Sequence, residues 1–233
     1  MALDRRELLA GFGFAALPVL CGGGRSRRLI HREDFRGDLR QWVVEAEKPG
    51  QLQLRAGVLD VVASAGLTLW FRPLLRGPVL ISYEAMAVSA GGPHDRVSDM
   101  NCFWMARDPR APDGDVLASP RSGRFADYDD LETYYVGLGG NSNTTSRFRR
   151  YVGRPGDRPL LPENDRTAPA DLLVANRWER IALIADGSDI RFDRNGRTMF
   201  RYRDPAPYRS GRFALRTTAS HLRMRRLAVY RLG

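Results

Sequence analysis

Short segments in which apolar and polar residues alternate run through most of this chain, and they constrain its fold more than any other feature. A period of two is typical of β-strands with one buried face, and no long helical stripe follows the first twenty residues. Many short strands without helices predict an all-β protein, a two-sheet jelly-roll sandwich. The candidate strands are Gln51–Leu54, Val58–Ala63, Leu67–Arg72, Val79–Ser89, Met100–Ala106, Leu131–Leu138, Arg147–Val152, Trp178–Asp186, Asp189–Arg194, Thr198–Arg203, Gly211–Thr217 and Arg223–Leu232.

Turns and loops divide these strands. Asn195-Gly196 lies between two alternating runs and predicts a type I′ hairpin turn, and Asp186-Gly187 is a second turn signal. Two connections, residues 107–130 and 153–177, are long and contain several prolines. Loops of this length are uncommon unless they bind something or are disordered. We expect both to form walls or lids over one sheet face.

The N-terminus has the pattern of an export signal. Arg5-Arg6 precedes an apolar run of 13 residues from Leu8 to Leu20, which is shorter than the roughly 20 residues that a membrane-spanning helix needs. A twin-arginine pair at this place is the address of the Tat pathway. We therefore expect a signal and stem over residues 1–28 and a periplasmic or extracellular protein, with acylation of Cys21 as a further possibility. A buried N-terminal helix is the alternative.

The rest of the composition fits one globular domain over residues 29–233. Of all residues, 43% are hydrophobic, which is sufficient for a core. The net charge is +10, but the basic residues, all arginines except Lys48, are scattered, so we do not expect nucleic-acid binding. The only cysteines are Cys21 and Cys102. Without Cys21 no internal disulfide can form, and we expect a monomer stabilised by its core.

Three stretches resemble a known group of proteins: Arg96–Pro109 (RVSDMNCFWMARDP), Tyr134–Tyr151 (YYVGLGGNSNTTSRFRRY) and Gly211–His221 (GRFALRTTASH). They are similar to motifs of a bacterial family of secreted proteins of unknown function, over roughly residues 30–233. The resemblance implies a concanavalin-like jelly roll, a fold similar to that of keto-disaccharide hydrolases, and a link to the use of pectin and rhamnogalacturonan. It brings no established catalytic residues.

The first of these stretches has polar side chains in alternate positions. On a strand through residues 99–105, Met100, Cys102 and Trp104 share one face, which we expect to be the core face. Asp99, Asn101, Phe103 and Met105 then share the other. We interpret Asp99 as a candidate acid or base and Asn101 as a ligand for sugar hydroxyls. Bracing of a loop by both residues is the alternative.

The second stretch contains a glycine-rich loop and an alternating basic strand. Asn141 and Asn143 suit hydroxyl recognition, unless the loop is only a tight turn. Arginine binds carboxylates in a bidentate way, so Arg147 or Arg149 could neutralise a uronic acid while a tyrosine or histidine removes a proton for β-elimination. The candidate catalytic residues are His221, Tyr135, Arg147 and Asp99, and the candidate substrate-binding residues are Asn101, Tyr134, Asn141, Asn143, Arg149 and Tyr151.

Other chemistries have weaker support. Asp130 and Glu132 are spaced so that a strand would bring them near the separation that glycoside hydrolysis needs, although solvated surface acids are the simpler interpretation. The three histidines, His31, His94 and His221, are far apart and show no metal-binding spacing. We expect no cofactor, and leave a structural calcium ion open.

These observations predict a secreted carbohydrate-active protein that cleaves an oligo- or polysaccharide, either as a polysaccharide lyase or as a glycoside hydrolase. If it is a lyase that acts by β-elimination, we expect an acidic saccharide. A non-catalytic carbohydrate-binding module is the main alternative, and a structural envelope protein is the third.

Overall fold

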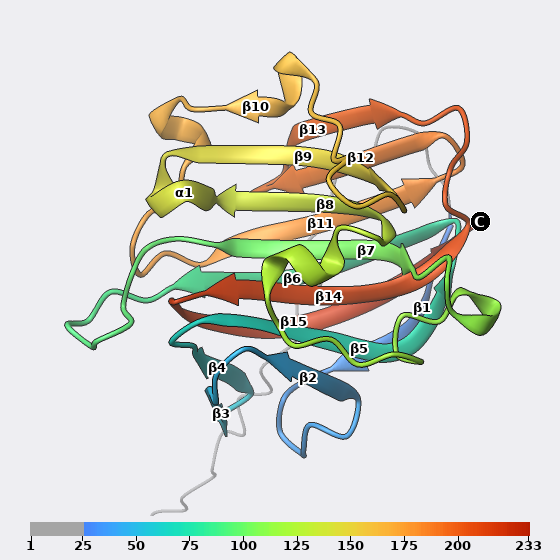
Figure 1. Ribbon diagram of the computed structural model, residues 1–233. Helices are drawn as coiled ribbons and strands as arrows, with labels where there is room; N and C mark the ends of the chain where they lie inside the picture. Colours follow the sequence, from blue (N-terminus) through green and yellow to red (C-terminus); the bar gives the residue numbers. More distant parts are fainter. Residues whose placement is uncertain (1–25) are drawn as a thin grey trace, which may run out of the picture.

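The protein is a sandwich of two antiparallel β-sheets, as a computed structural model describes it for residues 26–233 (Figure 1). Sheet A has eight strands in the order β13-β12-β11-β6-β15-β4-β3, with β1 beside β15. Its strands are β1 (Arg27–Glu33), β3 (Gln51–Arg55), β4 (Val58–Val62), β6 (Val79–Ala87), β11 (Glu179–Asp186), β12 (Asp189–Arg194), β13 (Arg197–Arg203) and β15 (His221–Leu232).

Sheet B has seven strands in the order β10-β9-β8-β7-β14-β5-β2. Its strands are β2 (Trp42–Ala46), β5 (Gly66–Arg76), β7 (Met100–Arg107), β8 (Glu132–Gly139), β9 (Thr145–Val152), β10 (Asp165–Arg166) and β14 (Ser210–Thr218). The predicted all-β sandwich is thus confirmed, and each of the twelve predicted segments contains a strand. Alternation did not reveal β1, β2 and β10. β10 has only two residues, and β2 places the carboxylate of Glu45 at a buried position.

The predicted hairpin at Asn195-Gly196 is also confirmed. β12 ends at Arg194 and β13 begins at Arg197, so the loop has two residues. Their φ angles are 53° and 82°. Positive φ at both positions is the property of a type I′ turn, which asparagine followed by glycine adopts most easily.

The main core lies between the two sheets. Met100, Cys102 and Trp104 of β7 are buried in it, as alternation predicts. Met105 is a correction, because it also lies in this core instead of sharing the face of Phe103. The pairing of β7 with β8 shifts register between Trp104 and Arg107, and Met105 has a φ of 53°. This β-bulge turns Met105 toward sheet A, which a strict period of two cannot predict.

A second apolar layer covers the opposite, outer face of sheet B. Trp70, Phe103, Tyr128, Tyr135 and Tyr151 belong to it. The connection between β7 and β8 lies across this face and contributes Tyr128 (Figure 1). The connection from β9 to β11 contains β10, which pairs with β9 and extends sheet B. The two long connections therefore border one sheet face, as predicted.

The predicted signal, including Arg5, Arg6 and Cys21, lies outside the described residues and stays a prediction. From residue 26 onward, no helix is long and apolar enough to cross a membrane. Cys102 is a buried free thiol.

Candidate functional site

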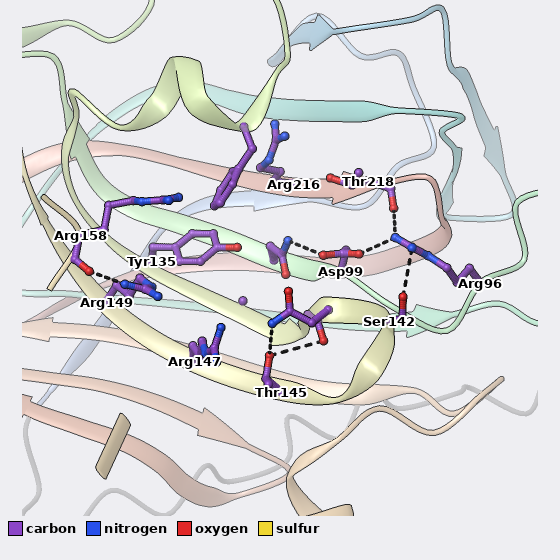
Figure 2. Close-up of a pocket in the computed structure, with 15 residues that line it drawn as sticks. Arg96, Asp99, Tyr135, Ser142, Thr145, Arg147, Arg149, Arg158, Arg216 and Thr218 are labelled. Carbon is purple, nitrogen blue, oxygen red and sulfur yellow. Dashed lines mark hydrogen bonds and ion pairs between the residues drawn. The ribbon is translucent and has the colours of Figure 1, made fainter. Parts of the chain in front are cut away.

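A pocket of about 460 Å³ opens on the outer face of sheet B (Figure 2). This volume falls in the usual range for small-molecule sites, about 300–1,000 Å³. Four neighbouring strands form its floor, β9, β8, β7 and β14. The lining residues are Arg96, Asp99, Asn101, Phe125, Tyr135, Gly137, Gly140, Asn141, Ser142, Thr145, Arg147, Arg149, Arg158, Arg216 and Thr218.

Tyr135 of β8 lies in the middle of the pocket (Figure 2). Its ring packs on Phe103 and Tyr151, with ring centroids 5.0 and 5.5 Å away. Burial raises the pKa of this phenol well above its usual value, and the neighbouring Tyr151 adds to the effect. The hydroxyl is therefore protonated at neutral pH and can donate a proton or a hydrogen bond.

Gly137, two residues further along β8, keeps the space beside this hydroxyl open. A Cβ atom at position 137 would lie 2.9 Å from the Tyr135 hydroxyl oxygen. Because residues i and i+2 of a strand point to the same face, any other side chain here would extend into the pocket. Glycine thus leaves the phenol accessible.

Asp99 lies at one end of the pocket and is held in place by its neighbours. Its Oδ2 accepts hydrogen bonds from the Arg96 guanidinium at 2.7 Å and from Ser98 Oγ at 2.6 Å. Oδ1 has the weaker contact, 3.4 Å from Asn101 Nδ2. Oδ1 of Asn101 is buried and has no hydrogen-bond partner among the described residues. A buried amide oxygen without a partner is uncommon and can accept a bond from a ligand hydroxyl.

Three of the predicted residues on the glycine-rich hairpin and β9 line the pocket: Asn141, Arg147 and Arg149. Asn141 Nδ2 donates to Thr145 Oγ1 at 3.1 Å, within the left-handed turn labelled α1 (Gly140–Asn143). Arg147 forms a bidentate ion pair with Asp165 of β10, at 2.8 and 3.0 Å. Arg149 donates to the backbone oxygen of Arg158. Together with Asp99, Asn101 and Tyr135, six predicted site residues share this pocket.

Four predicted residues do not line the pocket, and the expectation that they join it is corrected. Tyr134 and Tyr135 are adjacent on the strand and therefore point to opposite faces of the sheet. Tyr134 points into the core between the sheets, where its hydroxyl donates to Asp204 at 2.7 Å. Tyr151 shares the face of Tyr135 but is fully buried. Asn143 uses both ends of its amide to bind the backbone of Leu173, at 3.0 and 2.8 Å.

His221 is the fourth of these residues. It begins β15 of sheet A, and its two ring nitrogens contact Asp60 at 2.8 Å and Asp95 at 2.7 Å. The expected grouping of His221 with Tyr135 and Asp99 is therefore wrong. Sequence proximity of motifs could not show that β14 and β15 belong to different sheets.

The alternative carboxylate pair is also absent from the pocket. Asp130 precedes β8 and forms an ion pair with Arg110 at 2.5 Å, and Glu132 approaches Arg107 at 4.0 Å. Among the lining residues, Asp99 is the single carboxylate. The pocket thus lacks the two acids of the usual glycosidases.

Sequence reasoning missed several lining residues, above all Phe125, Arg158 and Arg216. Phe125 and Arg158 come from the two long connections, where no periodicity indicates direction. Arg216 carried a signal, since it is a charged residue that directly follows the apolar strand segment Phe213–Leu215. The structure buries it, with 2% of its surface exposed.

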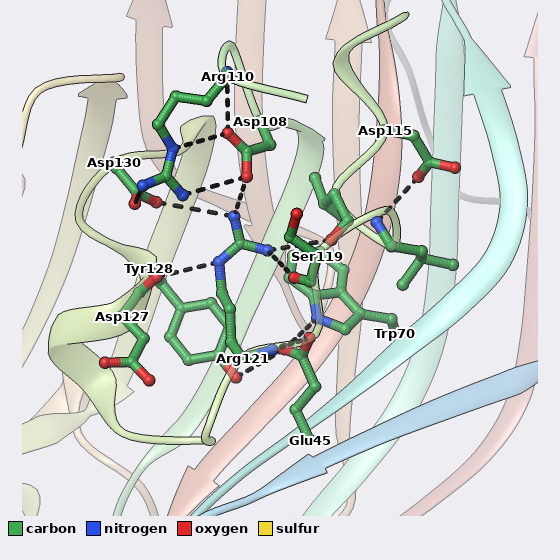
Figure 3. A network of polar contacts seen from close by, with 12 residues as sticks. Glu45, Trp70, Asp108, Arg110, Asp115, Ser119, Arg121, Asp127, Tyr128 and Asp130 are labelled. Carbon is green, nitrogen blue, oxygen red and sulfur yellow. Dashed lines mark hydrogen bonds and ion pairs between the residues drawn. The ribbon is translucent and has the colours of Figure 1, made fainter. Parts of the chain in front are cut away.

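Buried polar contacts fix the connection that carries Phe125 (Figure 3). The Arg121 guanidinium binds Asp108 at 2.5 Å and donates to the backbone oxygens of Val116 and Asp127, both at 3.0 Å. Glu45 of β2 accepts bonds from the Arg121 backbone N–H and from the indole N–H of Trp70. The Arg121 side chain therefore fixes the shape of the connection, and Glu45 fastens the connection to sheet B.

No group of three or more His, Cys, Asp or Glu side chains in residues 26–233 is arranged to hold a metal ion. The open question of structural calcium stays a prediction.

The part of the sequence that forms this pocket matches a known family. The family described as "Domain of unknown function (DUF6250)" matches residues 61–227, which contain every residue that lines the pocket. No curated protein matches the chain. The predicted link to pectin use stays a prediction.

Solved structures share the fold at low sequence identity. A protein of unknown function with a galectin-like fold from Bacillus subtilis has a TM-score of 0.68 at 15% identity, covering 90% of this chain and 99% of that one. The κ-carrageenase of Pseudoalteromonas carrageenovora, solved with a κ-carrageenan oligotetrasaccharide, has a TM-score of 0.60 at 11% identity, covering 94% and 100%. The carbohydrate-binding module CBM66 of Bacillus subtilis has a TM-score of 0.53 at 8% identity, covering 80% and 93%. These similarities show the fold alone.

Proposed function

The chain belongs to the family of domains of unknown function DUF6250, and from the pocket in its matched region we propose that it binds a saccharide and cleaves a glycosidic bond. The observation that carries this proposal is the meeting of a carboxylate, Asp99, and a protonated phenol, Tyr135, in one pocket. The phenol hydroxyl points toward the Asp99 end of the pocket (Figure 2). Proteins of this fold that bind or cleave saccharides support a carbohydrate ligand.

The lining favours elimination over hydrolysis. Hydrolysis by the usual mechanism needs two carboxyl groups on either side of the scissile bond, and Asp99 is the single lining carboxylate. In elimination, Asp99 takes a proton from a ring carbon and the electron pair of that C–H bond becomes a carbon–carbon double bond. The bond to the glycosidic oxygen breaks, and Tyr135 gives its phenolic proton to that oxygen. The ring carbon must carry an electron-withdrawing group such as a carboxyl.

Binding without cleavage is the second candidate. The contacts of Asp99 favour it, because Arg96 and Ser98 already occupy its Oδ2, at 2.7 and 2.6 Å, and leave that oxygen less free to take a proton from a ligand. In this case the unpartnered Asn101 and the hydroxyls of Ser142 and Thr145 would serve recognition alone.

The test is a screen against polyuronates and neutral glycans that follows both new reducing ends and the ultraviolet absorbance of the conjugated double bond in an unsaturated product. We expect both signals with a polyuronate. In Tyr135→Phe the rate of cleavage should fall at least about a hundredfold. Tyr230→Phe in sheet A is the matched control and should cleave normally.

Three other results have distinct meanings. Reducing ends without the absorbance would reject elimination in favour of hydrolysis. Saccharide binding without either signal would support the binding module. Equal cleavage by wild type and Tyr135→Phe would remove Tyr135 from the mechanism.

A further inference from the structure

The arginines of the pocket fall into two groups according to their ion pairs. Five arginines and one aspartate line it. Three of these arginines are balanced by carboxylates, namely Arg96 by Asp99, Arg147 by Asp165 and Arg158 by Asp129. Arg149 and Arg216 form no ion pair with any carboxylate of residues 26–233. The pocket thus retains two cations without counter-charge.

Arg216 is the more buried of the two. Its side chain lies under Phe125 and Tyr128, with the guanidinium carbon 5.0 and 4.9 Å from the ring centroids. One terminal nitrogen donates to Thr68 Oγ1 at 2.8 Å and to the Gly123 backbone oxygen at 2.9 Å, while Nε has no partner in the described chain. A buried cation without a direct ion pair is costly in an empty site and is stabilised when an anion binds.

Arg149 lies on the other side of the Tyr135 ring (Figure 2). Burial lowers the pKa of its guanidinium, and the like charges of Arg158 and Arg147 lower it further. Arg149 therefore lies beside two other cations, Arg147 and Arg158, each of which has its own carboxylate partner, while Arg149 itself has no ion pair with any described residue. An anion beside it would meet the one guanidinium of the three that no carboxylate holds.

We propose that Arg149 and Arg216 form the subsite for an anionic group of the saccharide, a carboxylate or a sulfate ester, bound beside Tyr135. The inference rests on the proposed function for the saccharide itself, and it adds the charge class of the ligand and the place where the charge binds. Guanidinium groups suit both anions because their N–H donors match pairs of anionic oxygens. The unpartnered Oδ1 of Asn101 would accept a hydroxyl of the same sugar. Arg147, which already holds Asp165, is excluded from this role.

The test is titration calorimetry on the full chain carrying Tyr135→Phe, in which the proposed cleavage should be slow on the time scale of the titration. The probes are tri-galacturonate, a sulfated κ-carrageenan oligosaccharide, neutral galactotriose and inorganic sulfate. We expect at least one charged oligosaccharide to bind about tenfold or more tightly than the neutral one, with affinity falling as salt rises. Arg149→Gln should weaken that binding about tenfold or more. Arg216→Lys should weaken it to a similar extent, because lysine keeps the charge but lacks the paired N–H donors of the guanidinium.

The matched control is Arg180→Gln, which removes the same charge from an exposed position on sheet A and should leave the affinity unchanged. Circular dichroism and thermal unfolding check that each variant is folded. Whether the carboxylated or the sulfated probe binds identifies the source of the anion.

Equal affinity for charged and neutral probes would overturn the inference, and so would unchanged binding in a folded Arg149→Gln. The proposed function would survive both results if the wild type still cleaves a glycan. Sulfate binding that requires Arg149, without binding of any oligosaccharide, would support the anion subsite and count against the saccharide. No binding of any probe would overturn both.

Discussion

At the scale of single residues, the fate of each polar side chain depends on which side of a strand it occupies. Tyr134 and Tyr135 are neighbours, yet one hydroxyl binds Asp204 in the core and the other faces the pocket. The arginines show the same dependence on surroundings. Arg147 and Arg149 share a face of β9, but Asp165 reaches only the first. The residue type therefore predicts what a side chain can do, and its contacts decide what it does.

Glu179 is the residue for which a pH effect on stability is clearest. It is fully buried, and burial opposes its ionisation. Hydrogen bonds from Arg194, at 2.8 and 3.0 Å, and from Arg177, at 2.9 Å, outweigh burial and lower the pKa of the carboxyl. A folded-state pKa below the unfolded one contributes stability at higher pH, and this contribution is lost as pH falls through the folded-state value.

We expect Glu179→Gln to lower the free energy of unfolding by about 3–5 kcal/mol near neutral pH, because the buried Arg194 guanidinium loses its anion. The difference from wild type should begin to narrow near the ordinary glutamate pKa of about 4.3, where the carboxyl of the unfolded chain protonates, and should be lost as pH falls through the lower folded-state pKa. Denaturant unfolding across this pH range measures this, with exposed Glu163→Gln as the control. A difference that stays constant with pH would contradict the assignment.

At the scale of elements, the site depends on a loop as much as on strands. β7, β8, β9 and β14 supply the floor of the pocket, and the connection between β7 and β8 supplies Phe125, which covers Arg216. This connection has only short 3-10 turns of its own, so its shape depends on polar anchors such as Arg121. The long loop is thus part of the site.

Arg121→Gln should loosen this connection from within, because the Arg121 side chain joins Asp108 to backbone oxygens of the same connection. Arg121 and Asp108 are 5% and 2% exposed, so the substitution leaves a buried carboxylate with weaker pairing, a loss of about 3–5 kcal/mol. We expect faster hydrogen exchange in residues 108–131 and weaker saccharide binding, while sheet A remains protected. Arg124→Gln, at an exposed position of the same connection, is the control. Uniformly faster exchange in both sheets would instead make Arg121 a determinant of the whole fold.

At the scale of the whole molecule, stability comes from the layer between two sheets. Cys102 is buried in the middle of that layer. Burial raises the pKa of its thiol to about 12, and only the thiolate is strongly nucleophilic. The thiol therefore reports whether the sandwich as a whole has opened.

In a Cys21→Ser variant, where Cys102 is the single thiol, we expect no labelling by a thiol reagent in the folded protein. Labelling should follow the rate of global unfolding, and reducing agents should leave the melting temperature unchanged. The control is the same variant in denaturant, which should label at once. Rapid labelling under native conditions would mean that the sandwich opens locally at β7.

The sequence by itself determined twelve of the fifteen described strands and, through alternation, that Asn101 lies opposite the core face of its strand and that Arg147 and Arg149 share one face. This information is local, because residues i and i+2 of a strand point the same way whatever the strand pairs with. The β-bulge at Met105 is the exception, since it arises from pairing with β8. Gly211 of β14, whose Cβ would collide with the Met105 backbone, is its only trace in the sequence.

Only the tertiary structure decided which of these residues meet. The order β9-β8-β7-β14 brings Arg216 beside Tyr135, whereas the next strand, β15, joins sheet A and takes His221 away. Likewise the ion pair of Arg147 with Asp165 depends on how the connection after β9 returns to the sheet. Strand order and counter-charges are set by the free energy of the whole chain, in which contacts between distant segments outweigh local preference. The two unbalanced arginines are therefore a property of the fold.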